Sequence, residues 1–148
     1  MSSPTTIAAP QFTWYQASSG SLSGGAKTRN VNGSAIVGYV GMGGTITLQD
    51  IDGGSSGGTK LLAVDYINGE WTQWSNVTCP NCREALFSVN GGAAVRAQMP
   101  LSGEASWDIL FQNFLISLPG FKPGKTNTVV INNPSAYSPD FYRIGVEV

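Results

Sequence analysis

The sequence contains no histidine, and only 11% of its 148 residues are charged. Histidine is the side chain that most often transfers protons near neutral pH and that most often ligates metals. The eight basic and nine acidic residues give a net charge of −1, whereas a nucleic-acid-binding face needs excess positive charge to neutralise phosphates. The composition therefore favours a protein that binds a ligand rather than converts it, and it argues against nucleic acid as the partner.

Long apolar runs and a recognisable leader are also missing. No stretch approaches the roughly 18–20 apolar residues that a membrane-spanning helix requires, so membrane insertion is not expected. Residues 1–6 lack the charged start and the apolar run of a secretion signal. Two origins stay open: a protein made in the cytosol, or a secreted protein whose signal has been removed.

Glycine and proline are abundant, with 19 and 8 copies, which indicates strands joined by tight turns. A chain of 148 residues is expected to form one domain. We expect an all-β, jelly-roll-like β-sandwich of about nine strands over residues 11–148, preceded by a flexible segment at 1–10. The expected strands, rich in β-branched and aromatic residues, are Gln11–Gln16, Ala35–Val40, Thr45–Gln49, Leu61–Ile67, Ala85–Val89, Ala93–Met99, Ile109–Leu118, Thr128–Asn132 and Phe141–Val148.

The most informative stretch is 131–144, which indicates a strand, a proline-bounded loop and a final strand. The loop region carries two amides, Asn132 and Asn133, and one aromatic ring, Tyr137. Amides hydrogen-bond sugar hydroxyls, and aromatic rings stack on the C–H faces of sugars. Because function in a β-sandwich is usually carried by its loops, this loop is a candidate for binding a neutral sugar.

Other aromatic residues leave alternatives open. Trp14 lies in the first expected strand and is expected to pack in the core or on the sheet. Tyr39 has small neighbours and is either a core residue or an exposed stacking surface, and the same alternatives hold for Trp107 at a loop–strand junction. Trp71 and Trp74 flank a polar stretch, where they either pack a long loop down or form a surface platform.

Five motifs follow one another along the chain, each weak by itself. They are Tyr15-Gln-Ala-Ser with Leu22-Ser-Gly-Gly-Ala, then Val37 to Leu48, Phe87 to Gly92, Ser106-Trp-Asp and Asn133 to Ile144. In this order they resemble carbohydrate-binding module family 35, most of all the modules attached to fungal galactose-releasing enzymes, and more distantly family 6. The resemblance covers roughly residues 12–148 and implies a β-sandwich that binds glycans without cleaving them.

The resemblance also implies a site, because relatives hold a sugar in a cleft made by loops at one end of the sandwich. Two rings supply stacking faces worth on the order of 1 kcal/mol beyond area burial. Polar groups then select the hydroxyl pattern, since an unmatched buried amide costs about 1–3 kcal/mol. We expect a neutral galactose-containing glycan. The positions carried over are Tyr39 and Trp107 for stacking, Asn133 for hydroxyls, Tyr137 as a further wall, and Asn132 and Asp140 as further polar partners.

The structural calcium of the family is not expected here, and no cofactor is expected. Relatives hold this ion with carboxylates, whereas the corresponding residues in this chain are Gln16, Ser18 and Tyr142. Calcium prefers several oxygen ligands, above all charged ones. An amide, a hydroxyl and a phenol remove most of that attraction. A ligand-bridging calcium, as in uronic-acid binders of the family, is also unexpected because acidic residues are few.

Cys79 and Cys82 enclose a Pro-Asn pair. A redox site requires the first cysteine at a helix N-terminus, but a strand is expected to follow. A zinc site requires four ligands, and two cysteines without histidine do not supply them. Either a disulfide that pins a turn or a pair of free thiols remains.

Two other functions stay open beside glycan binding. A protein-interaction or structural sandwich would expose an apolar patch. A small glycoside hydrolase would need two carboxylates about 5–10 Å apart. A free-standing fungal lectin would be cytosolic and could form a homodimer, since two joined sites gain avidity, whereas a module cut from a larger enzyme would be secreted. The candidate carboxylates, of which no pair is marked by the sequence, are Asp65, Glu70, Glu104, Asp108 and Asp140.

Overall fold

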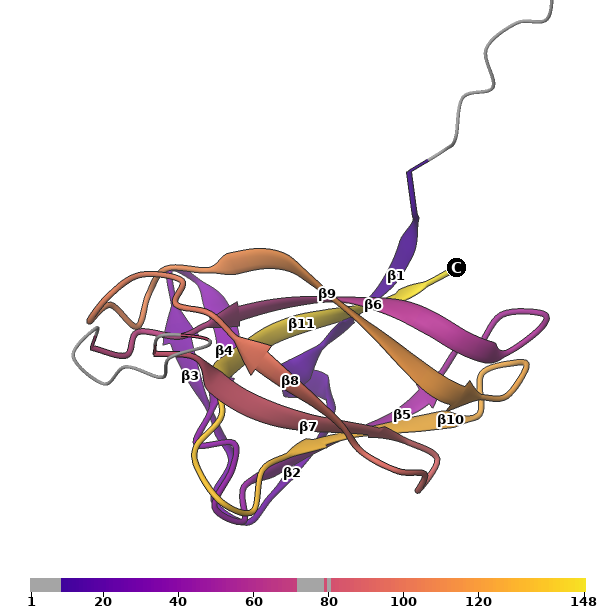
Figure 1. Ribbon diagram of the computed structural model, residues 1–148, viewed down its shortest axis with the longest axis horizontal. Coiled ribbons are helices and arrows are strands. Elements are labelled where there is room, and N and C mark those ends of the chain that lie inside the picture. Colours follow the sequence, from indigo (N-terminus) through magenta and orange to yellow (C-terminus); the bar gives the residue numbers. More distant parts are fainter. Residues whose placement is uncertain (1–8, 72–78, 80) are drawn as a thin grey trace, which may run out of the picture.

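The computed structural model describes residues 9–71, 79 and 81–148. In these residues eleven strands form two antiparallel sheets that pack face to face (Figure 1). The expected all-β sandwich is thereby confirmed. The first sheet has the order β3-β4-β11-β6-β9 with β1 beside β11, and the second has the order β2-β5-β10-β7-β8. The elements are β1 (Phe12–Gln16), the 3-10 turn η1 (Ala17–Ser19), β2 (Ser21–Ser23), β3 (Lys27–Val31), β4 (Ser34–Gly38), β5 (Thr45–Ile51), β6 (Gly58–Ile67), β7 (Arg83–Val89), β8 (Val95–Met99), β9 (Phe111–Phe121), β10 (Asn127–Asn132) and β11 (Asp140–Glu147).

Two strands were not expected from the sequence. Both β2 and β3 are short, and neither contains a fully buried residue. Among the described strands, each lies at the edge of its sheet and pairs with a single neighbour, β2 with β5 and β3 with β4. Because an edge strand of this kind buries little, its sequence lacks the apolar alternation by which strands are recognised.

The core lies between the two sheets. Phe87 of β7 and Phe141 of β11 are fully buried, and their rings meet edge to face with centroids 6.1 Å apart, which joins one sheet to the other. Replacing either ring with alanine would cost about 3–5 kcal/mol. Tyr66 is also buried, and its hydroxyl donates a hydrogen bond of 2.8 Å to the carbonyl of Pro100.

Trp14 lies on the face of the first sheet that points away from the core. It is paired with Gly145, whose neighbours Ile144 and Val146 are buried in the core. The guanidinium of Arg143 lies 4.0 Å from the centre of the Trp14 ring. Of the two alternatives for Trp14, packing on the sheet is therefore the one that the structure shows.

Four connections gather at one end of the sandwich, at the left of Figure 1. Backbone contacts join two of them: Gly41 bridges Tyr137, and the amide of Ser138 donates to the carbonyl of Val40 at 2.8 Å. Gly41 has φ +103°, and a Cβ there would collide with the carbonyl oxygen of Ala136. Glycine is required because only it permits this close approach. The connections are those between β4 and β5, β6 and β7, β8 and β9, and β10 and β11.

The two ends of the described chain lie close together. Phe12 in β1 pairs with Glu147 in β11, near the C-terminus (Figure 1). Residues 1–8 of the segment expected to be flexible lie outside the described residues. In the described part of the chain, no helix has the length and apolar character needed to cross a membrane.

Candidate functional site

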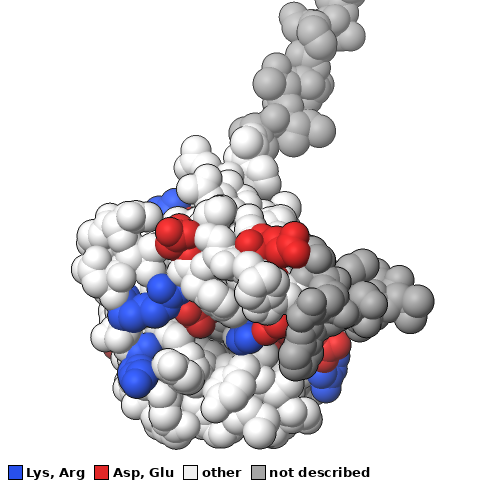
Figure 2. Space-filling view, turned by 90° about the vertical axis from the view of Figure 1, so that its left-hand side faces the viewer, with Lys and Arg blue, Asp and Glu red and all other residues white. Residues whose placement is uncertain are grey.

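A hollow of about 390 Å³, here called the rim hollow, lies among the gathered loops. Figure 2 faces this end of the molecule and shows basic and acidic side chains interspersed among uncharged ones, with no broad patch of one sign. Four of the six carried-over site residues lie together here: the aromatic residues Tyr39, Trp107 and Tyr137, and Asp140. The complete lining is Arg29, Gly38, Tyr39, Arg83, Trp107, Tyr137 and Asp140.

Tyr39 and Tyr137 form the open part of the rim hollow. Their side chains are 57% and 48% exposed, and their ring centroids are 6.2 Å apart at an angle of 81°. Tyr39 adopts φ 55°, a left-handed conformation that costs a bulky residue on the order of 1 kcal/mol or more. Of the two alternatives for Tyr39, the structure shows the exposed one.

Trp107 is half-buried and is held by two arginines. Arg29 donates from Nη2 to the Trp107 carbonyl at 2.5 Å and from Nε to Asp140 Oδ2 at 2.8 Å. The guanidinium of Arg83 lies 4.6 Å from the centre of the Trp107 ring, within the range of a cation–π contact. Arg83 in turn donates from Nε and Nη2 to Glu70 Oε1. Each arginine is thus anchored to a carboxylate, and together they fix the position of the indole.

A glycine on the neighbouring connection also makes room for Trp107. A Cβ at Gly69 would lie 2.9 Å from Trp107 Cδ1 and would collide with the carbonyl oxygen of Ser106. Any larger residue would therefore push the 103–108 connection away.

Arg29 and Arg83 were not expected as site residues from the sequence. Arg29 lies on the polar edge strand β3, which has no apolar alternation, and Arg83 follows Cys82 directly. The only indication was indirect: a buried carboxylate such as Asp140 needs a cationic partner. The pairing itself could not be read from the sequence, because Arg29 and Asp140 are 111 residues apart along the chain.

Asp140 lies at the base of the rim hollow and is mostly buried. Burial raises the pKa of the Asp140 carboxyl above its ordinary value of 3.8. The hydrogen bond and the charge of Arg29, together with the charge of Arg83, act in the opposite direction. The carboxylate and the two guanidinium groups therefore form one coupled set below the open rings.

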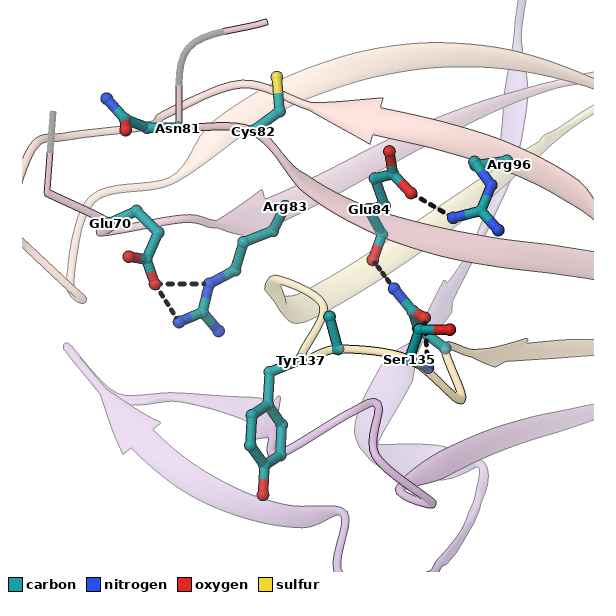
Figure 3. A pocket seen from close by; sticks show the side chains of 10 residues that line it. Glu70, Asn81, Cys82, Arg83, Glu84, Arg96, Ser135 and Tyr137 are labelled. Carbon is teal, nitrogen blue, oxygen red and sulfur yellow. Dashed lines mark hydrogen bonds and ion pairs between the residues drawn. The ribbon is translucent and has the colours of Figure 1, made fainter. Parts of the chain in front are cut away.

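A second hollow of about 430 Å³ adjoins the rim hollow, and Figure 3 shows it from close by. The two hollows share Arg83 and Tyr137. In Figure 3 the side chains of Glu70 and Arg83 lie on one side and those of Glu84 and Arg96 on the other. The complete lining is Glu70, Asn81, Cys82, Arg83, Glu84, Arg96, Asn133, Ser135, Ala136 and Tyr137.

The two asparagines carried over from the family lie outside the rim hollow. Asn133 lines the second hollow and is only 2% exposed. Its Nδ2 donates to the carbonyl of Glu84 at 3.0 Å, and its Oδ1 accepts from the amide of Ser135 at 3.0 Å. Asn132 pairs with Leu86 in the sheet and lines neither of these two hollows. Contact of either amide with a sugar stays a prediction.

The positions that correspond to the family calcium site do not fit that ion. Gln16 is exposed, and its backbone carbonyl accepts a hydrogen bond of 2.7 Å from the Ser19 hydroxyl. Tyr142 is half-buried, with the Arg143 guanidinium 5.6 Å from its ring centre. A neighbouring cation and the lack of carboxylates are both unfavourable for calcium. Within residues 9–71, 79 and 81–148, no group of three or more His, Cys, Asp or Glu side chains is placed to hold a metal.

Two open questions from the sequence concern the connection between β6 and β7: the state of the two cysteines and the exposure of Trp71. Cys79 and Cys82 form a disulfide, with Cα atoms 5.5 Å apart. Trp71 is 58% exposed and lines neither hollow. Trp74, its expected companion, lies outside the described residues.

Several candidate carboxylates are engaged by neighbouring side chains. Asp65 pairs with Arg143 on the outer face of the first sheet at 2.7 Å. Asp108 accepts a hydrogen bond of 2.5 Å from the Ser106 hydroxyl. At the two hollows, Glu70 and Asp140 each bind an arginine, as described above.

Known proteins were compared with this chain in sequence and in structure. No family model matches the sequence. The chain is 35% identical over 113 residues to a probable alpha-galactosidase D from Aspergillus flavus, a match that covers 62% of this chain and 16% of that enzyme. The chain therefore spans about a sixth of the length of the curated relatives it matches.

Among solved structures, a family 35 carbohydrate-binding module from Clostridium thermocellum matches with a TM-score of 0.72 and 19% identity, over 92% of this chain and 98% of that one. The fold is that of a family 35 carbohydrate-binding module. An exo-beta-1,3-galactanase from Phanerochaete chrysosporium, solved with beta-1,3-galactotriose, matches with a TM-score of 0.74 and 27% identity, over 91% of this chain and 29% of that one. The resemblance drawn from the five motifs, to family 35 and to fungal galactose-related enzymes, is thereby confirmed.

Proposed function

We propose that this chain binds carbohydrate without cleaving it, and that the rim hollow holds a neutral galactose-containing glycan. The observation that carries the proposal is the pair of open rings, Tyr39 and Tyr137, beside Trp107 over a floor of hydrogen-bonding groups. The family 35 fold supports carbohydrate binding. Similarity to an alpha-galactosidase and to a galactanase supports galactose as the sugar.

The chemistry of the rim hollow suits such a ligand. The C–H face of a galactose unit would lie against a ring face that no cation covers, since Arg83 lies over the Trp107 indole and Lys27 Nζ lies 4.9 Å from the centre of the Tyr39 ring. The guanidinium groups of Arg29 and Arg83 and the carboxylate of Asp140 offer donors and an acceptor for sugar hydroxyls. Apolar contact would supply affinity, and these polar groups would supply selectivity.

The arginine pairs also support binding without cleavage. A glycosidase needs one protonated carboxyl as acid and a second carboxylate that is free to act as nucleophile or base. At the hollows, Glu70 is held by Arg83 and Asp140 by Arg29. Because each carboxylate is held by an arginine, neither is free to serve as the nucleophile or base of a hydrolase.

The test is the affinity for galactose and for arrayed glycans, measured for the wild type and for two single variants, Tyr39→Ala and Trp107→Ala. Loss of one stacking ring, worth about 0.5–1.5 kcal/mol beyond area burial, is expected to weaken a low-affinity site beyond detection while circular dichroism shows an intact fold. Trp71→Ala is the matched control, because this exposed ring lines neither hollow.

Three results would count against the proposal. The first is the absence of binding to every arrayed glycan, and the second is unchanged affinity in both ring variants. The third is the release of reducing ends from a galactan by the purified chain, which would indicate a hydrolase.

A further inference from the structure

We infer that the second hollow is a subsite for the next sugar unit, so that the chain recognises an oligosaccharide rather than a single sugar. The inference rests on the proposed function, because the rim hollow must hold the first unit. It adds to that proposal a second site and a minimum length of the ligand.

The first support is continuity. The rim hollow of about 390 Å³ and the second hollow of about 430 Å³ share Arg83 and Tyr137 as common walls. Each volume by itself lies within the range of roughly 300–1,000 Å³ that is typical of small-molecule sites. A glycan chain that leaves the rim hollow past the half-exposed Tyr137 ring would enter the second hollow directly.

The second support is charge balance. Four charged residues line the second hollow, and they form two ion pairs, Glu70 with Arg83 and Glu84 with Arg96 (Figure 3). Their formal charges cancel, so the walls attract neither an anion nor a cation. Hydrogen-bonding groups without net charge fit a neutral sugar unit, in agreement with a galactose-containing chain.

The experiment compares the dissociation constants of galactose and beta-1,3-galactotriose by titration calorimetry on the full chain. An array that carries each sugar as a monosaccharide and as an oligosaccharide identifies the series that binds best. We expect the trisaccharide of that series to bind at least tenfold more tightly than its monosaccharide. In Ser135→Trp, where an indole fills the second hollow from an exposed loop position, this ratio should fall to about one. Ser55→Trp, at an exposed serine between β5 and β6, should keep the ratio.

The outcomes separate the two proposals. If the wild type binds mono- and oligosaccharides equally well, or if Ser135→Trp keeps the high ratio, the second subsite is refuted while the proposed function holds. If no sugar of any length binds, the proposed function fails and the subsite fails with it.

Discussion

Replacement of Arg29 by methionine should both destabilise the fold and weaken sugar binding. Methionine keeps much of the apolar stem but removes the hydrogen bonds to Asp140 at 2.8 Å and to the Trp107 carbonyl at 2.5 Å. Breaking a fully buried pair costs about 3–5 kcal/mol, and breaking an exposed pair costs about 0–1 kcal/mol. The Arg29 and Asp140 side chains are 35% and 12% exposed, so the pair lies between these limits. We expect a loss of roughly 1–3 kcal/mol at pH 7, or about 3–10 °C in Tm.

The assay is urea unfolding followed by tryptophan fluorescence, with galactose affinity measured on the same samples. Most of the cost comes from an unpaired buried carboxylate, so adding Asp140→Asn to Arg29→Met should recover part of the lost stability. Sugar affinity should not recover, because Trp107 has still lost its anchor. Arg96→Met is the stability control, since Arg96 is 53% exposed in its pair with Glu84 and should cost less than about 1 kcal/mol. Equal stability of Arg29→Met and the wild type would refute the reasoning.

Two further predictions concern pH and calcium. Because burial raises the pKa of Asp140 above 3.8, galactose affinity should fall as the pH drops through the raised pKa, where protonation removes the charge that holds Arg29. The contribution of this raised pKa to stability has the opposite trend: it is fully present below pH 3.8 and is lost as the pH rises through the raised pKa. Measurement of galactose affinity as a function of pH checks the prediction for binding. If the inflection persists in Asp140→Asn, a group other than Asp140 is responsible for it. For calcium, a chelator should leave Tm unchanged in a thermal scan; a fall of many degrees would mean that a bound ion stabilises the fold by mass action.

The strands that pack the core were predictable because their side chains alternate between interior and solvent. Ala85, Phe87 and Val89 of β7 are buried in the core, whereas Leu86 and Ser88 between them are only partly buried. The edge strands β2 and β3 were missed because they bury almost nothing. Fold class thus follows from the residues that lose water, and edge strands contribute little to that signal.

The arrangement of residues at the rim hollow was predictable only in part, and for a comparable reason. Tyr39 and Tyr137 are marked by motifs and small neighbours, and both are exposed at the rim. Trp107 was also expected there, but its cover by Arg83 was not. The sequence around an arginine does not indicate which aromatic ring its guanidinium will contact.

The sequence by itself determined an all-β chain, a family 35 resemblance and the replacement of the carboxylates at the family calcium positions, since each is a property of residue type and local order. Only the tertiary structure decided that Cys79 and Cys82 are joined, that Tyr39 is open, and that Asp140 meets Arg29 from a strand 111 residues away. It also decided that two hollows share the walls of Arg83 and Tyr137. Such facts depend on which loops meet when the two sheets close over the core, and pairing between distant segments leaves no local pattern to read.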